Sequence, residues 1–187
     1  WRARIQARRG DISDPSIALN HPSLEQVWDS LAHLTDPEIP VVTLKEMGIL
    51  RDVALDGDTV VVTITPTYNG CPAMSQIEDD VRNALGERGW HAVVITRLSP
   101  AWSTDWMDAT THRKLREYGI APPTGAAPAS GQRGVHLVRR LGSSNSVPCP
   151  RCGSEQTTET SYFGSTACKA LYKCLACLEP FDYFKPN

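Results

Sequence analysis

Two pairs of cysteines near the C-terminus constrain the fold of this chain more than any other feature. Cys149 and Cys152 form one C-x-x-C pair, and Cys174 and Cys177 form a second pair after a spacer of 21 residues. A C-x-x-C turn places two thiolates on one side of a tight loop, and two such loops facing each other make a closed tetrahedral site for Zn²⁺. The spacing therefore predicts a zinc ribbon over residues 146–187, with these four cysteines binding a structural Zn²⁺.

Two other interpretations of the cysteine pairs stay open on spacing alone. Rubredoxin-like iron sites also use paired C-x-x-C loops, and two disulfides would use the same four residues. Nothing in the chain indicates secretion, which disfavours disulfides. Cys168 lies six residues before Cys174, outside both pairs. Its isolated position predicts a bystander thiol, with ligand exchange or a function of its own as alternatives.

The charge distribution limits the classes of partner. The 187 residues carry a formal net charge of −2, with −7 on residues 23–122 and zero on residues 146–187. A nucleic-acid surface usually needs a basic patch, so no nucleic-acid partner is expected. The sequence has no run of about eighteen apolar residues, so no membrane span is expected. Reduced cysteines without a signal-peptide core predict a cytoplasmic protein.

The chain divides into four parts. Residues 1–22 are rich in arginine and predict a flexible N-terminal tail. Residues 23–122 alternate between helical and strand periodicity, which predicts a folded domain. Residues 123–145 are rich in Pro, Gly, Ala and Ser and predict a linker to the zinc ribbon;.

The sequence predicts the element order α-β-β-α-β-α for the folded domain. Helical spacing and a capping box at Ser23 and Gln26 predict a helix over residues 24–34, and the proline-rich segment that follows breaks it. A hairpin is expected over residues 49–55 and 59–65, and a third strand over 92–98. Two further helices are expected, one after Pro72 that ends at Gly89, and one from Ser103 or Thr104 to Tyr118 with Gly119 as its stop;. This order predicts an α+β fold, a small α/β sandwich with a mixed sheet, followed by the zinc ribbon.

Cys71 is the most chemically suggestive residue of the folded domain. It directly precedes Pro72, at or next to the expected N-terminus of a helix. Unsatisfied backbone N–H groups and the helix dipole would lower the pKa of its thiol there, and the thiolate could attack an electrophile or bind a soft metal. A small buried apolar cysteine fits the same position, and spacing alone does not choose between the two.

The chain lacks the sequence signatures of a catalyst. It has no nicotinamide, flavin or nucleotide fingerprint, and no paired Glu-x-x-His ligands of a di-iron site;. We therefore expect that the chain is not an enzyme by itself.

Several motifs resemble known families. The segment from Asp36 to Val42, the segment 65–72 that contains Cys71, and residues 99–107 resemble the MIP18 (DUF59) domain, a family tied to iron–sulfur cluster and metal-centre assembly. Residues 163–170 and 180–185 flank the zinc cysteines. Together with the MIP18-like domain they resemble the PaaD subunits of bacterial phenylacetyl-CoA epoxidase, over about residues 22–187.

The resemblance implies a function and a second site. It implies an accessory factor in aerobic phenylacetate degradation that assists assembly of the iron–sulfur cluster or di-iron centre of the epoxidase. The partners would be its oxygenase or reductase subunits, and a homodimer is left open. It maps the reactive cysteine of the family onto Cys71 and its Asp-Pro-Glu motif onto Asp36 and Glu38, a seat for transient iron or a cluster. The two carboxylates could instead only bond backbone amides in the turn. A structural subunit of the monooxygenase is the alternative, and a zinc-ribbon nucleic-acid module is disfavoured by charge.

Overall fold

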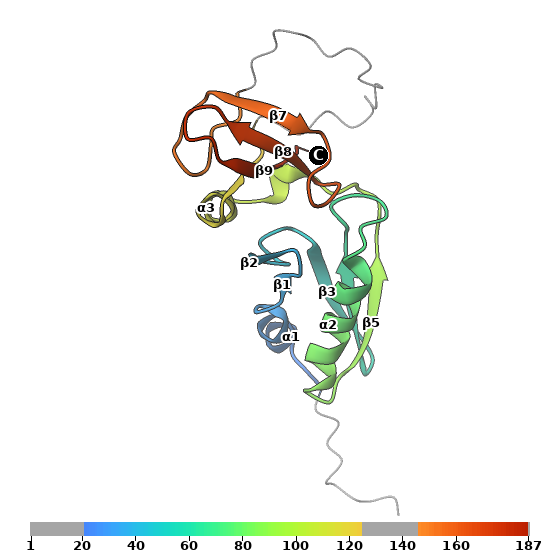
Figure 1. The fold of residues 1–187 in the computed structure, drawn as a ribbon. Coiled ribbons are helices and arrows are strands. Elements are labelled where there is room, and N and C mark those ends of the chain that lie inside the picture. The colour runs from blue at the N-terminus through green and yellow to red at the C-terminus, as the bar shows by residue number, and fades with distance from the viewer. Residues whose placement is uncertain (1–20, 125–145, 187) are drawn as a thin grey trace, which may run out of the picture.

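The computed structural model describes residues 21–124 and 146–186 (Figure 1). Residues 21–119 form the N-terminal lobe, and residues 120–124 together with 146–186 form the C-terminal lobe. The predicted tail over residues 1–22 and the predicted linker over 123–145 lie almost entirely outside the described residues. No helix within the described ranges is long and apolar enough to cross a membrane.

The first helix, α1 (Leu24–Leu31), begins at the capping box that the sequence predicts. The backbone N–H of Gln26 donates to the Ser23 hydroxyl at 3.2 Å, and the Ser23 N–H donates to the side-chain oxygen of Gln26 at 2.8 Å. Each residue thus satisfies a backbone donor that the helix leaves unpaired. The helix ends at Leu31 rather than at the expected Leu34.

A small antiparallel strand pair follows α1, where the sequence predicts only a break. β1 (Thr35–Asp36) pairs with β2 (Ile39–Thr43) around a turn at Pro37 and Glu38. Pro40 lies within β2, and its ring is exposed. A two-stranded pair tolerates this proline because both of its strands are edges, so a missing N–H need not break a ladder.

The main sheet has three strands in the order β3-β4-β5. β3 (Leu50–Asp56) and β4 (Thr59–Ile64) form the predicted antiparallel hairpin, which turns at Gly57 with φ of 56°. α2 (Met74–Gly86) then crosses over, and β5 (His91–Thr96) pairs with β4 in parallel. The predicted mixed sheet is therefore confirmed (Figure 1). Alternate residues of β4 are fully buried under the helices: Val60, Val62 and Ile64.

The last helix of the N-terminal lobe differs from prediction at its start. A 3-10 turn, η1 (Thr104–Trp106), follows Ser103, and α3 (Ala109–Tyr118) begins only after it. Asp108 is the N-cap, since its carboxylate accepts the backbone N–H of Thr111 at 2.7 Å. The expected stop at Gly119 is confirmed, with φ of 100° at that residue;.

The C-terminal lobe is a four-stranded sheet in the order β6-β9-β8-β7. β7 (Thr157–Ser161), β8 (Lys169–Cys174) and β9 (Pro180–Phe184) are antiparallel neighbours. β6 (Ile120–Ala121) adds to β9 in parallel. The sequence assigns residues 120–121 to the first domain, whereas in the structure they are the edge strand of the second sheet.

Phe184 of β9 packs into the core of the N-terminal lobe, so the two lobes share buried surface. Its ring lies 5.8 Å from that of Trp102, centroid to centroid. The Trp102 indole N–H in turn donates to the Met47 carbonyl oxygen at 2.8 Å, which fixes the indole against the N-terminal core. The remaining apolar residues of the C-terminal sheet form a smaller core of their own.

Candidate functional site

The structure brings together the four cysteines that the sequence predicts as metal ligands. Their sulfur atoms all lie within 4.8 Å of one another. The Sγ atoms of Cys149 and Cys177 are 3.8 Å apart, and those of Cys152 and Cys174 are 3.6 Å apart. Four sulfurs bound to Zn²⁺ at about 2.3 Å in a tetrahedron would be about 3.8 Å apart, so the arrangement suits such an ion. All six cysteines are free thiols, which disagrees with two disulfides.

Similar turns place the two cysteine pairs. The residue after each pair has a positive φ: 74° at Gly153 and 67° at Leu178. The backbone N–H of Cys177 donates to the Cys174 sulfur at 3.4 Å. This N–H, together with that of Ala176 and the neighbouring cysteine side chains, lowers the pKa of Cys174, whereas the neighbouring cysteines raise the pKa of Cys177, so one thiolate of the cluster is favoured over the others;. A thiolate that persists at neutral pH is the form that a metal requires.

Cys71 lies in the loop between β4 and α2, and its environment differs from the expected one. The N-cap of α2 is Ala73, so Cys71 stands before the cap rather than on it. Burial raises the pKa of the Cys71 thiol, and the negative charges of Glu38 and Asp36 raise it further. The Ala73 N–H lowers it only in part. The expectation of a lowered thiol pKa is therefore wrong, because the side chain is half-buried beside two carboxylates.

Asp36 and Glu38 have different roles around Cys71. One carboxylate oxygen of Asp36 accepts the backbone N–H groups of Glu38 at 2.8 Å and Ile39 at 3.0 Å. Asp36 thus closes the turn between β1 and β2, as one of the two sequence interpretations predicts. Its side chain is buried, and burial raises its carboxyl pKa despite these bonds. Glu38 is half-buried, and its charge acts on the thiol of Cys71.

The C-terminal lobe contributes two further groups to this neighbourhood. Cys168 is half-buried and packs against the N-terminal core, away from the four-cysteine cluster. The charges of Glu38 and Asp36 reach its thiol as they reach that of Cys71. Lys169, only 4% exposed, lies close enough to Asp36 to lower its pKa. Residues far apart in sequence therefore form one charged, thiol-containing cluster.

A cavity of about 180 Å³ opens beside this cluster, at the junction of the lobes. Thr67 and Tyr68 line it from the N-terminal lobe, and Cys168 and Phe184 line it from the C-terminal lobe. Burial and the neighbouring Cys71 thiol raise the pKa of Tyr68 to about 12, so Tyr68 connects the cavity to that cysteine.

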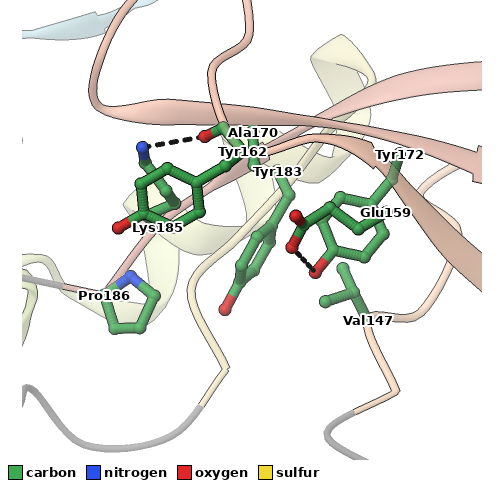
Figure 2. Close-up of a pocket in the computed structure, with 8 residues that line it drawn as sticks. All are labelled: Val147, Glu159, Tyr162, Ala170, Tyr172, Tyr183, Lys185 and Pro186. Carbon is green, nitrogen blue, oxygen red and sulfur yellow. Dashed lines mark hydrogen bonds between the residues drawn. The ribbon is translucent and has the colours of Figure 1, made fainter. Parts of the chain in front are cut away.

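A second pocket, of about 260 Å³, lies within the C-terminal lobe (Figure 2). The Tyr172 hydroxyl donates to the Glu159 carboxylate at 3.4 Å, and the Lys185 ammonium donates to the Tyr162 carbonyl oxygen at 3.0 Å. No cysteine lines this pocket, whereas Cys168 lines the cavity at the junction of the lobes. The residues that line this second pocket are Val147, Glu159, Tyr162, Ala170, Tyr172, Tyr183, Lys185 and Pro186.

The sequence gives no signal for Tyr68 and Lys169, and its indication that Cys168 is a bystander thiol stays a prediction. The positions of Cys168 and Lys169 relative to Asp36, Glu38 and Cys71 carry no spacing signal, because their approach depends on how one lobe packs on the other. The buried Phe184 from β9, directly before Lys185, is the apolar anchor that creates this contact.

Comparison with known families agrees with this architecture. Residues 24–95 match the family described as iron-sulfur cluster assembly protein, and residues 134–185 match the PaaD zinc beta ribbon domain. A protein of Escherichia coli (strain K12), provisionally named as one of the subunits of 1,2-phenylacetyl-CoA epoxidase, is 46% identical over 165 residues, which are 88% of this chain and 93% of that protein.

Further relatives cover the N-terminal part of the chain. The Fe-S protein maturation auxiliary factor YitW of Bacillus subtilis (strain 168) is 30% identical over 95 residues, 50% of this chain and 86% of YitW. The solved structure of a DUF59 domain from Bacillus anthracis is 28% identical, with a TM-score of 0.43, and covers 46% of this chain and 85% of that one. The solved structure of a conserved hypothetical protein of Thermotoga maritima is 26% identical, with a TM-score of 0.43. The match covers 52% of this chain and 93% of that one.

The fold and the cysteine sites define a class of protein: an α+β domain of the iron–sulfur cluster assembly type that carries a C-terminal zinc-ribbon domain. The comparisons also define a narrower family within this class. The chain belongs to the PaaD family, as the match to the E. coli protein over nearly its full length shows.

Proposed function

We propose that this protein is an accessory factor of a phenylacetyl-CoA epoxidase, which helps to assemble the iron–sulfur cluster or the di-iron centre of the enzyme rather than performing the epoxidation. Two relatives support this. The E. coli protein is named as a subunit of the epoxidase, and YitW is named as a maturation factor for Fe-S proteins. The partners would be the oxygenase or reductase subunits.

The observation that carries the proposal is the environment of Cys71. A half-buried thiol lies within electrostatic reach of Glu38 and Asp36, and it interacts with Tyr68, which lines a cavity. Sulfur and carboxylate oxygen together suit iron, which accepts both kinds of ligand. Iron or a cluster would here be cargo that the protein receives and passes on.

The electrostatics of Cys71 favour reversible binding. Burial raises its thiol pKa, so at neutral pH the proton competes with the metal for the sulfur;. Glu38 and Asp36 raise the thiol pKa as well, but the same negative charges attract a cation;. A site that must release its cargo needs such moderate affinity.

The four-cysteine site is proposed to hold a structural Zn²⁺. Cys149 and Cys174 are buried, and the sulfur separations match a tetrahedral site closed on all sides by protein ligands;. Such an ion would join the loop that precedes β7 to the turn that follows β8, and through β9 it would hold Phe184 against the N-terminal core.

The experiment that tests the proposal compares the epoxidase made in cells with the wild-type chain, with Cys71→Ser, with Ser75→Ala as a control at an exposed site, and without this chain. Iron per oxygenase and reductase subunit is measured, together with growth on phenylacetate. We expect Cys71→Ser to be folded and zinc-loaded, to abolish growth and to leave the epoxidase deficient in iron. Ser75→Ala should behave as wild type.

The alternative is a structural subunit of the monooxygenase, favoured by the word subunit in the name of the E. coli relative. It predicts that the chain co-purifies with the oxygenase in a fixed ratio and that Cys71→Ser leaves growth and iron content unchanged. That result would overturn the maturation role.

A further inference from the structure

The cavity at the junction of the lobes is lined mainly by aromatic side chains. Trp102 and Tyr68 line it from the N-terminal lobe, and Tyr162, Phe163 and Phe184 line it from the C-terminal lobe. The described residues that line it include no aspartate or glutamate. A cavity of about 150 Å³ is known to take up benzene, so this one, of about 180 Å³, has room for a single ring with a short chain;.

Two of these aromatic side chains, Tyr162 and Phe163, are exposed although their backbone is held in place. Tyr162 is 60% exposed and Phe163 is 64% exposed, and their rings meet edge to face with centroids 5.1 Å apart. The Ser161 hydroxyl donates to the Phe163 carbonyl oxygen at 2.8 Å and accepts the Phe163 N–H at 3.3 Å. The Gly164 N–H donates to the Lys169 carbonyl oxygen at 2.8 Å. Large apolar rings that stay exposed on an ordered loop are pre-organised to contact a ligand.

Lys185 brings a positive charge to this aromatic cavity. Its ammonium nitrogen lies 3.9 Å from the centroid of the Tyr162 ring and 4.9 Å from that of Phe163, and it donates to the Tyr162 carbonyl oxygen (Figure 2). Among the described residues it forms no salt bridge. Glu159, whose charge reaches it, is bonded to the Tyr172 hydroxyl in the second pocket. Burial lowers the pKa of Lys185, as expected for a half-buried cation without a close counter-ion;.

We propose that this cavity is a binding site for a small aromatic carboxylate, whose ring lies among the aromatic side chains and whose carboxylate pairs with the Lys185 ammonium. Aromatic rings pack favourably edge to face or offset, and a hydrogen bond between two charged groups is among the strong ones. The inference goes beyond the maturation role and needs neither Cys71 nor the four-cysteine site as a ligand. Because the walls come from both lobes, a bound ligand also strengthens the contact between them.

The chemistry of the walls separates this class of ligand from others. Lys185 repels an organic cation. A neutral ring would leave the ammonium without a counter-ion, and an aliphatic anion would leave the aromatic walls without a stacking partner. A nucleotide is too large for about 180 Å³. In the competing explanation, the rings of Tyr162 and Phe163 only shield the Lys185 side chain, and no ligand enters.

Isothermal titration calorimetry of the full-length, zinc-loaded chain tests the proposal with phenylacetate, a single ring with one carboxylate, as the probe. Phenylacetamide keeps the ring and lacks the charge, acetate keeps the charge and lacks the ring, and benzylamine reverses the charge. Lys185→Met and Phe163→Ala are compared with Lys173→Met, at an exposed position of β8 that lines neither cavity. Circular dichroism confirms that each variant is folded.

We expect phenylacetate to bind about tenfold or more tightly than each of the other three compounds, because only phenylacetate uses both the rings and the ammonium. Lys185→Met should weaken phenylacetate binding by about tenfold or more and leave phenylacetamide binding unchanged. Phe163→Ala should weaken both ring compounds by about two- to tenfold. Lys173→Met should match wild type. A wild-type chain that does not bind phenylacetate, or equal phenylacetate affinity in wild type and Lys185→Met, would overturn the site.

A second measurement locates the ligand without a substitution. In the ¹⁵N-labelled wild-type chain, phenylacetate should shift the indole N–H signal of Trp102 and the backbone amide signals of residues 162–168 in the nuclear magnetic resonance spectrum. Shifts confined to the second pocket, around Val147 and Tyr172, would contradict the proposed place of binding. The maturation role is judged separately, by the iron content of the epoxidase from Cys71→Ser cells, so either proposal can fail without the other.

Discussion

Lys169 of the C-terminal lobe acts electrostatically on Asp36 of the N-terminal lobe across the junction of the lobes. Asp36 is 8% exposed and Lys169 is 4% exposed. Burial raises the pKa of Asp36, and the positive charge of Lys169 lowers it in part. Lys169 also lies 3.8 Å from the Asp182 carboxylate of its own lobe. The ammonium group thus acts on negative charge from both lobes.

Removing this ammonium should destabilise the protein. Lys169→Met leaves Asp182 without its ion-pair partner and removes the positive charge that acts on the buried Asp36, and breaking a buried ion pair typically costs about 3 kcal/mol;. We expect a loss of that size in the free energy of unfolding, measured by urea denaturation. Lys173→Met, at an exposed position of the same strand, should change stability by less than about 0.5 kcal/mol. Equal stability of the two variants would contradict the role of Lys169.

Trp102 connects the N-terminal core to the C-terminal lobe, and its truncation tests this connection. Trp102→Phe removes the indole N–H that pairs with the Met47 carbonyl, and an unsatisfied buried acceptor costs about 1–3 kcal/mol;. A double-mutant cycle of Trp102→Leu with Phe184→Leu, which removes both rings, should give a coupling of about 1 kcal/mol, as expected for an aromatic pair;. Additive effects of the two substitutions in thermal and urea unfolding would show that the rings do not interact.

The sequence predicts the local elements well and the junction of the lobes poorly. The capping box at Ser23, the β-branched run of β4 and the stop at Gly119 are local signals, and each element that they predict is present. The four cysteine ligands follow from a spacing rule that the metal itself imposes. The contact of Cys168 with the surroundings of Cys71 has no such rule, because Phe184 and Trp102 create it through tertiary packing.

Two errors have specific physical reasons. The cap of α3 is Asp108, because η1 uses Ser103 for its own first turn: the Ser103 hydroxyl accepts the Asp105 N–H at 3.2 Å. The pKa of Cys71 is raised rather than lowered, because helix-terminus effects fall off within one turn and burial beside carboxylates is stronger;.

Loss of one cluster cysteine should unfold the C-terminal lobe. In Cys152→Ser we expect loss of zinc and of the β7–β9 sheet, because metal binding supplies most of the folding free energy of such a small unit;. The N-terminal lobe should also lose stability, since Phe184 leaves its core. Zinc analysis and amide hydrogen exchange measure both effects. Cys168→Ser should keep its zinc, and full zinc retention in Cys152→Ser would contradict the assignment.

The left-handed residue after the second cysteine pair offers a stabilising change. Leu178 has φ of 67° and is 66% exposed, so its side chain gains little from packing. Left-handed backbone costs a non-glycine residue roughly 1–2 kcal/mol, partly offset by the greater unfolded-state entropy of glycine. Leu178→Gly should therefore raise the unfolding free energy of the zinc-loaded lobe by about 0.5–1 kcal/mol. Gly153→Ala, the reverse change at the equivalent position with φ of 74°, should lower it. Thermal unfolding of the two variants measures these changes in stability. A Leu178→Gly protein less stable than wild type would contradict backbone strain at Leu178.

The raised pKa values of Cys71 and Cys168 predict how the protein responds to alkaline pH. Burial is the main cause for both thiols, and the charges of Glu38 and Asp36 add to it. In the folded chain both thiols keep their protons above the ordinary thiol pKa of 9.0, whereas in the unfolded chain they ionise there. The folded state then binds more protons, so stability should fall as pH rises from about 9 upward, and less so in the Cys71→Ser and Cys168→Ser double variant.

Alkylation measures the same property directly, because only the thiolate reacts. In zinc-loaded protein the rate for Cys71 with iodoacetamide should have its pH midpoint above 9.0. Glu38→Gln removes a negative charge next to the thiol, so it should shift the midpoint of Cys71 downward and speed its alkylation at pH 8;. Glu117→Gln, an exposed change on α3, serves as the control and should leave the midpoint unchanged. A midpoint for Cys71 below 9.0 in the wild-type chain would mean that helix-terminus stabilisation of the thiolate outweighs burial and the two carboxylates.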